Sequence, residues 1–164
     1  MAMTDGWRSV EWENRVRLRI PPDWIVLAER AEGHDVAVFR PAADGAGVLR
    51  LLADERTPRS GDSAAAVLHE MTMRFVRPDD VRVSDRAVEP RGDGATLARA
   101  VLVGRSEESG EAESHYLWLV GAERAGRVRV AMFSFALPAS CDGREPYVTT
   151  LAALDEAIRT ADLL

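Results

Sequence analysis

Hydrophobic and polar positions along the chain predict a series of strands interrupted by two helices. The strongest signal lies near the C-terminal end, where two apolar runs, 115–121 and 128–137, flank the connection 122–127. In both runs apolar residues occupy both sides of an alternating pattern, which is typical of strands in the middle of a covered sheet. The Ala- and Gly-containing connection suits a hairpin. We therefore expect these two runs to form the centre of the sheet.

The N-terminal third predicts four further strands. Residues 12–20 alternate between apolar and charged side chains, which indicates one strand with a buried face and a solvent-exposed face. Pro21 and Pro22 end this strand. Residues 25–31 and 35–40 read as two strands around a turn at 32–34, where Gly33 permits a positive φ. Residues 48–55 form the fourth strand, after a loop rich in Pro, Ala, Asp and Gly.

Helical spacing predicts two helices. In 63–76 the apolar stripe suits a helix that Ser60 or Asp62 could cap and that stops before Pro78. Strands are expected at 81–89 and 96–105. A C-terminal helix follows from the spacing of Tyr147, Leu151, Leu154 and Ile158, with Asp142 and a proline as start signals.

The predicted order is four strands, a helix, four strands and a helix. Short turns between successive strands make them antiparallel, so the expected fold class is α+β, an antiparallel sheet covered by a mid-chain helix and a C-terminal helix. No internal repeat, low-complexity tract or second domain is visible in the sequence, and residues 1–164 are expected to form a single domain.

Composition narrows the function classes. A net charge of −6, a pI near 5.1 and arginines mixed with carboxylates argue against nucleic acid as a partner. Neither a secretory leader nor an apolar membrane span is visible, and the single Cys141 fits a reducing compartment. We therefore expect a cytoplasmic protein without a membrane partner.

A short corner motif, Ile-Pro-Pro-Asp-Trp, occupies residues 20–24. It is followed by a short hairpin, by Phe39-Arg40-Pro41 and by a strand that leads into the mid-chain helix. In this layout the chain resembles the PsbP/Mog1-like superfamily, which includes the bacterial DcrB-like and LpqN-like proteins. The resemblance covers nearly the whole chain and implies a sandwich fold and a binding or assembly role rather than an enzyme. Many bacterial relatives are exported or lipidated, whereas this chain shows neither a leader nor a lipobox. No functional residues of the group match residue by residue.

Candidate chemistry is sparse. His34, His69 and His115 lack the spacing of metal ligands, and Cys141 lies in no nucleophile signature. The glutamates near residues 107–113 fit a solvated hairpin tip better than a catalytic pair. We predict no cofactor, no metal and no catalytic residues.

The tryptophans are better candidates for functional residues, because aromatic residues anchor binding surfaces. Trp24 and Trp118 are expected in the core, whereas Trp7 precedes the first strand among polar neighbours. The sequence analysis therefore predicts that Trp7 or Trp12, with Arg17 or Arg19 from the wet face of the first strand, contacts a protein partner or a second copy of the chain in a homodimer.

Two functions remain open, with an enzyme as the third. The first is a non-enzymatic protein-binding or assembly module. The alternative is a carrier for a small apolar ligand, with a pocket between sheet and helix. A deep closed cavity would favour the carrier, with a lining drawn from Met71, Phe75, Trp118, Met132 or Phe133, and a filled core with an exposed apolar patch would favour the binding module.

Overall fold

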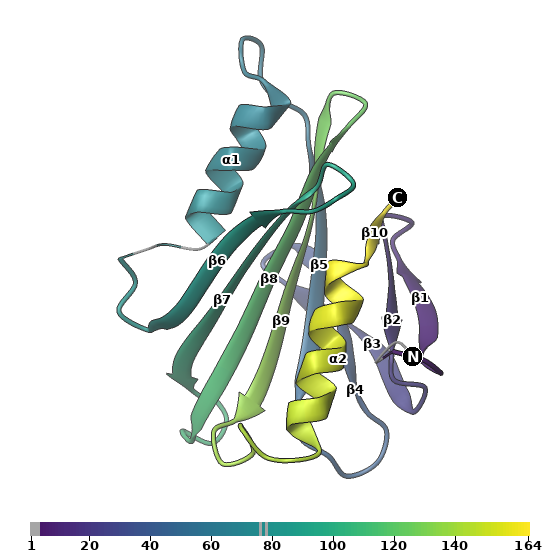
Figure 1. Ribbon diagram of the computed structural model, residues 1–164, viewed down its shortest axis with the longest axis vertical. Helices are drawn as coiled ribbons and strands as arrows, with labels where there is room; N and C mark the ends of the chain where they lie inside the picture. The colour runs from purple at the N-terminus through teal and green to yellow at the C-terminus, as the bar shows by residue number, and fades with distance from the viewer. Residues whose placement is uncertain (1–3, 76, 78) are drawn as a thin grey trace.

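The computed structural model describes residues 4–75, 77 and 79–164, and in that part of the chain ten strands and two helices form an α+β fold (Figure 1). In chain order the elements are β1 (Arg8–Trp12), β2 (Val16–Ile20), β3 (Trp24–Ala31), β4 (His34–Pro41), β5 (Val48–Arg56), α1 (Ala64–Phe75), β6 (Val83–Pro90), β7 (Thr96–Arg105), β8 (Ala112–Arg124), β9 (Arg127–Pro138), α2 (Tyr147–Arg159) and β10 (Asp162–Leu163). The predicted fold class is confirmed.

A seven-stranded antiparallel sheet has the order β3-β4-β5-β9-β8-β7-β6. The two apolar runs form β8 and β9, which pair along their whole length and lie inside the sheet, as their two-sided apolar pattern predicts. Ala125 and Gly126 make the turn between them with φ of 53° and 75°. The β3–β4 hairpin also forms, with its turn at Glu32 and Gly33.

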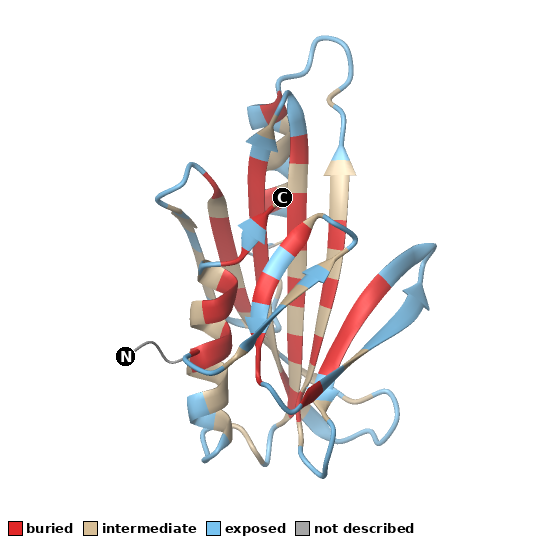
Figure 2. Ribbon diagram, turned by 90° about the vertical axis from the view of Figure 1, so that its right-hand side faces the viewer, coloured by how far each residue is buried: buried red, intermediate tan, exposed pale blue. Residues whose placement is uncertain are grey.

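One face of this sheet is covered by α2 and by a three-stranded sheet of order β1-β2-β10 (Figure 1). The core between these layers includes Phe133 and Phe135 from β9 and Leu154 and Ile158 from α2, each at most 1% exposed. Buried positions therefore lie along the strands and on one side of α2 (Figure 2).

The opposite face is covered in part by α1, whose Leu68 lies over Gly121 of β8. A Cβ at position 121 would overlap with Leu68 Cδ1, so the glycine lets the helix approach the sheet closely. Val128 and Val130 of β9 complete this second, smaller core.

The prediction of one strand over 12–20 is wrong, because the chain turns back at Glu13 and Asn14, with φ of 52° and 56°. The Arg15 N–H donates to the Trp12 carbonyl oxygen at 2.9 Å and closes this turn. Trp12 then lies opposite Val16, on the same side of the sheet, so the alternation continues through the turn and conceals it.

Other boundaries also differ. The C-terminal strand β10, which pairs with β2, was not predicted, and the order is five strands, α1, four strands, α2 and β10. Ser63, rather than Ser60 or Asp62, caps α1, because its Oγ accepts the Ala66 N–H at 3.1 Å. Val81 is 98% exposed and precedes β6. Val76 and Pro78, which the sequence places at the end of the first helix, lie outside the described residues.

Candidate functional site

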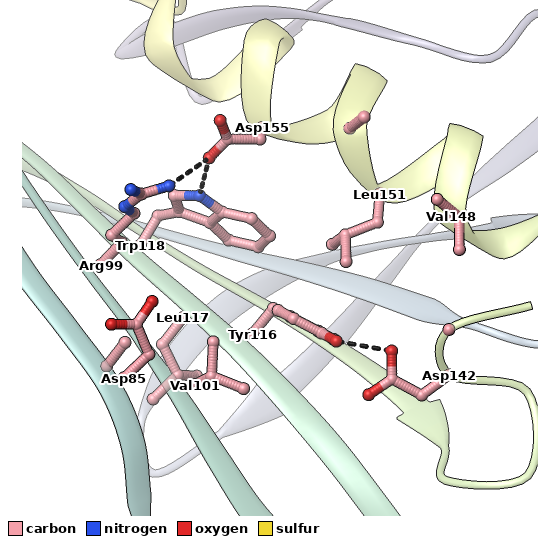
Figure 3. Close-up of a pocket in the computed structure, with 13 residues that line it drawn as sticks. Asp85, Arg99, Val101, Tyr116, Leu117, Trp118, Asp142, Val148, Leu151 and Asp155 are labelled. Atoms are coloured by element: carbon pink, nitrogen blue, oxygen red, sulfur yellow. Dashed lines mark hydrogen bonds and ion pairs between the residues drawn. The ribbon is translucent and has the colours of Figure 1, made fainter.

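The candidate site is a pocket of about 430 Å³ between α2 and strands β6, β7 and β8, which we call the α2 pocket (Figure 3). Its apolar lining comes from Val101 on β7, Tyr116 and Trp118 on β8, and Val148 and Leu151 on α2. Tyr116 and Trp118 point to the same face because they are two residues apart in a strand. The register places Val101 opposite Tyr116, which joins the apolar surface of β7 to that of β8.

Asp142 forms one polar end of the α2 pocket, in the loop between β9 and α2. Its Oδ1 accepts a hydrogen bond of 2.6 Å from the Tyr116 hydroxyl, and its Oδ2 accepts one of 2.6 Å from the Ser114 hydroxyl. Ser114 is only 7% exposed. The two bonds therefore tie the loop that precedes α2 to strand β8.

These contacts fix the protonation of both partners. Burial by itself would raise the pKa of Asp142, but the hydrogen bonds from Ser114, Tyr116 and the Gly143 N–H outweigh burial and lower that pKa. Burial, and secondly the bond to Asp142, raises the pKa of Tyr116 above its ordinary value. Near neutral pH Asp142 is a carboxylate and Tyr116 a neutral phenol, a state suited to orienting a bound molecule.

Asp155 on α2 forms the other polar end. Its Oδ1 accepts the Trp118 indole N–H at 2.9 Å, and its Oδ2 accepts the Arg159 Nε–H at 2.7 Å. Arg99 on β7 lies further away, with Nη1 3.9 Å from Asp155 Oδ1. Arg159 also pairs with Glu89 on β6, so a network of charges links α2 to the edge of the sheet.

The α2 pocket meets part of the sequence-based criterion for a ligand carrier. Trp118 lines it, but Phe75, Met132 and Phe133 border a separate hollow of about 220 Å³ on the opposite face of the sheet. Met71 packs in the small core beneath α1. The single closed cavity that would gather these side chains therefore does not form among the described residues.

The predicted partner-binding residues do not share one surface. Trp12 is partly buried against the main core, on the inner side of the small sheet. Arg17 and Arg19 alternate with the buried residues of β2 and so lie on its outer side, where Arg17 pairs with Glu11 at 2.5 Å. Trp7 is also partly buried against the core. Their role in partner binding stays a prediction.

Sequence reasoning missed the residues that the structure brings together in the α2 pocket. Asp142 was interpreted as a start signal for the C-terminal helix, yet its carboxylate bonds side chains that are 26 and 28 positions away. Trp118, expected in the core, is indeed 3% exposed, while its indole N–H points to Asp155. The one available signal was the polar side chain of Ser114 at the start of an apolar strand.

His115 and the glutamates of the segment 107–113 do not line the α2 pocket. His115 Nε2 is 3.5 Å from Glu113 Oε1, on β8, and Glu107 and Glu108 are exposed at the tip between β7 and β8. Residues 4–75, 77 and 79–164 contain no group of three or more His, Cys, Asp or Glu side chains arranged to hold a metal ion. Within the same residues, neither helix has the length and apolar character that crossing a membrane requires.

Comparison with solved structures identifies the fold. The chain superimposes on LpqN, involved in cell envelope biogenesis of Mycobacterium tuberculosis, with a TM-score of 0.62 and 15% identity over 95% of this chain and 89% of LpqN. The chain has an LpqN-like fold. This confirms, at the level of the fold, the resemblance to LpqN-like proteins drawn from the Ile-Pro-Pro-Asp-Trp corner.

A second solved structure to which this chain is similar is a protein of Bacteroides thetaiotaomicron VPI-5482, with a TM-score of 0.55 and 19% identity. That match covers 91% of this chain but 45% of the longer Bacteroides chain. No family model matches the sequence, and no curated protein matches it.

Proposed function

We propose that this protein is a non-enzymatic binding module that takes a small molecule with an apolar body in the α2 pocket. The observation that carries the proposal is the apolar surface of Tyr116, Leu151 and Val148 between two fixed carboxylates, Asp142 and Asp155. A volume of about 430 Å³ suits a small organic ligand. Because hydrogen bonds already hold both carboxylates, little side-chain entropy would be lost on binding.

The structural similarity to LpqN supports a proposal about the cellular process in which this module acts. LpqN is involved in cell envelope biogenesis, and we propose a role in the same process for this chain. A cytoplasmic location, as the sequence predicts, is part of the proposal. Fractionation of native cells, with detection of the protein by antibody, would test that location.

A pair of matched valines tests the α2 pocket itself. Val148 and Val88 are each 44% exposed, but only Val148 lines the pocket, whereas Val88 lies on the other face of β6. Val148→Trp should fill the pocket and abolish the shift that 1-octanol causes in the Trp118 indole N–H signal in nitrogen-15 NMR spectra. Val88→Trp should leave that shift unchanged. Equal binding by both variants, or no response in the wild-type protein, would refute the proposal.

A second copy of the chain is the second candidate partner, and the edge strand β3 favours it. β3 pairs with β4 in regular register over eight residues and exposes Ile25 and Leu27, by 36% and 42%, on one side. The opposite edge, β6, carries a register shift between Val83 and Asp85, a feature that discourages pairing with another chain.

The β3 edge would pair with the same edge of a second copy. Leu27→Lys should then lower the dimer fraction measured by light scattering, and Val103→Lys, at another exposed position, should not. A wild-type protein that stays monomeric at high concentration would contradict this second candidate.

A further inference from the structure

Within residues 4–75, 77 and 79–164, Asp142 is a carboxylate without a cationic partner. Its three hydrogen-bond donors, the hydroxyls of Ser114 and Tyr116 and the Gly143 N–H, are all neutral. No arginine or histidine in the described part of the chain lies within 4.0 Å of its oxygens. The negative charge is therefore fixed in place by dipoles but is not neutralised.

The other end of the α2 pocket is different. Asp155 forms an ion pair with Arg159 at 2.7 Å and lies 3.9 Å from Arg99. A ligand cation would gain little there, because two guanidinium groups already face this carboxylate.

The lining as a whole is acidic. Among the described residues it contains three carboxylates, Asp85, Asp142 and Asp155, and one guanidinium, Arg99, while Arg159 pairs with Asp155 from outside the lining. Asp85 lies on β6, on the side of the pocket opposite α2, and its Oδ1 accepts a hydrogen bond of 2.9 Å from the neighbouring Arg86 N–H. The field of the pocket therefore favours a positively charged group over a negative one.

The surface beside Asp142 is apolar and aromatic. Figure 3 shows the ring of Tyr116 leading from the strand to Asp142, with Leu151 and Val148 on the helix above it. Aromatic rings attract cations through their faces, and the aliphatic side chains would contact an uncharged body.

Resting on the small-molecule binding proposed above, we propose that the ligand of the α2 pocket is a cationic amphiphile of the alkylammonium class. Its positively charged nitrogen is held at the Asp142 carboxylate, and its apolar body lies against Tyr116, Val148 and Leu151. The ammonium supplies the counter-charge that the described residues do not provide at Asp142, and the apolar body displaces water from the strand and the helix.

Three probes with the same chain length but different charge test this inference: octylammonium, 1-octanol and octanoate. Binding is measured by calorimetry at pH 7 and by the Trp118 indole N–H signal. Octanol and octylammonium can both donate a hydrogen bond to the Asp142 carboxylate, but only the ammonium adds an attraction between opposite charges, so octylammonium should bind about tenfold more tightly than octanol. Octanoate should bind most weakly.

Asp142→Asn should remove the preference for octylammonium while leaving octanol binding in place. Asp62→Asn, which makes the same change in net charge in the exposed segment before α1, should keep the preference. If Asp142→Asn does not fold, the three-probe series on the wild-type protein still tests whether the ligand is cationic.

Each outcome has one meaning. Equal binding of octanol and octylammonium, or tighter binding of octanoate through Arg99, would overturn the cationic ligand and leave the apolar pocket intact. Failure of all three probes would overturn the proposed small-molecule function as well.

Discussion

Removing the Tyr116 hydroxyl tests the polar end of the α2 pocket. Tyr116→Phe deletes the donor that lies 2.6 Å from Asp142 Oδ1 and leaves the aromatic ring and the Ser114 bond in place. A hydrogen bond to a charged group contributes about 1.5–3 kcal/mol to stability. Because Asp142 is only partly buried, solvent replaces some of the lost bond, and we expect the low end, about 1.5 kcal/mol.

The measurement is urea unfolding of Tyr116→Phe beside Tyr147→Phe, followed by circular dichroism. Tyr147 is the matched control, since its hydroxyl accepts a weaker bond of 3.4 Å from the neutral Ala46 N–H. Its loss should cost about 0.5 kcal/mol or less. Equal unfolding free energies for the two variants would refute the strong contact between Tyr116 and Asp142.

The pH dependence of the same variant gives a second test. The pKa of Asp142 is lower in the folded state than in the unfolded chain, so its charge stabilises the fold above the ordinary value of about 3.9, and this contribution is lost as the pH falls through the folded-state pKa. The Tyr116→Phe penalty should therefore shrink to about 0.5–1 kcal/mol in strong acid, where the bond joins two neutral groups. A penalty that is constant from pH 7 to pH 2.5 would show that the carboxylate charge is not involved.

Two further predictions concern the loop before β5 and the N-terminal tryptophan. Gly47→Ala should destabilise the protein by about 2–4 kcal/mol, because φ at Gly47 is +98° and the new Cβ would lie 2.5 Å from the buried Phe135 ring. The control is Gly61→Ala, where φ is +92° but no atom lies within 4 Å of the new Cβ. This control should cost about 1 kcal/mol in the same urea assay. Trp7→Ala should weaken self-association or partner capture in light-scattering and pull-down measurements more than Arg19→Ala does, and an unchanged result would remove Trp7 from the predicted partner contact.

Elements with a strong periodic pattern were predictable from the sequence. In β9, Phe133 and Met132 fall on opposite sides and both contact core residues, so the two-sided apolar pattern correctly placed this strand inside the sheet. In α2, Leu154 and Ile158 are four residues apart and both fully buried, as an amphipathic helix requires.

The turn at Glu13 and Asn14 could not be recognised by periodicity. Trp12 and Val16 are four positions apart, which preserves the apolar–polar alternation whether the chain continues straight or turns back. Asn14, a residue that tolerates positive φ, was the only local sign of the turn.

The α2 pocket depends on contacts between distant parts of the chain. Asp142 meets Tyr116 only because the β8–β9 register pairs Glu113 with Pro138, which brings the loop after β9 beside the start of β8. Asp155 meets Trp118 across 37 positions, through the packing of α2 on the sheet. Neither distance has a signature in a single sequence, because both follow from tertiary packing.

The position of the pocket follows from the widths of the layers. Seven strands about 4.8 Å apart span about 29 Å, whereas one helix covers about 10 Å and three strands about 10 Å more. The layer of α2 and the small sheet is therefore about two strands too narrow for the face that it covers. The deficit falls over β6 and β7, where Asp85, Arg99 and Val101 line the pocket in place of a core (Figure 3). The fold thus creates the hollow, and Asp142 and Asp155 place charged side chains at its two ends.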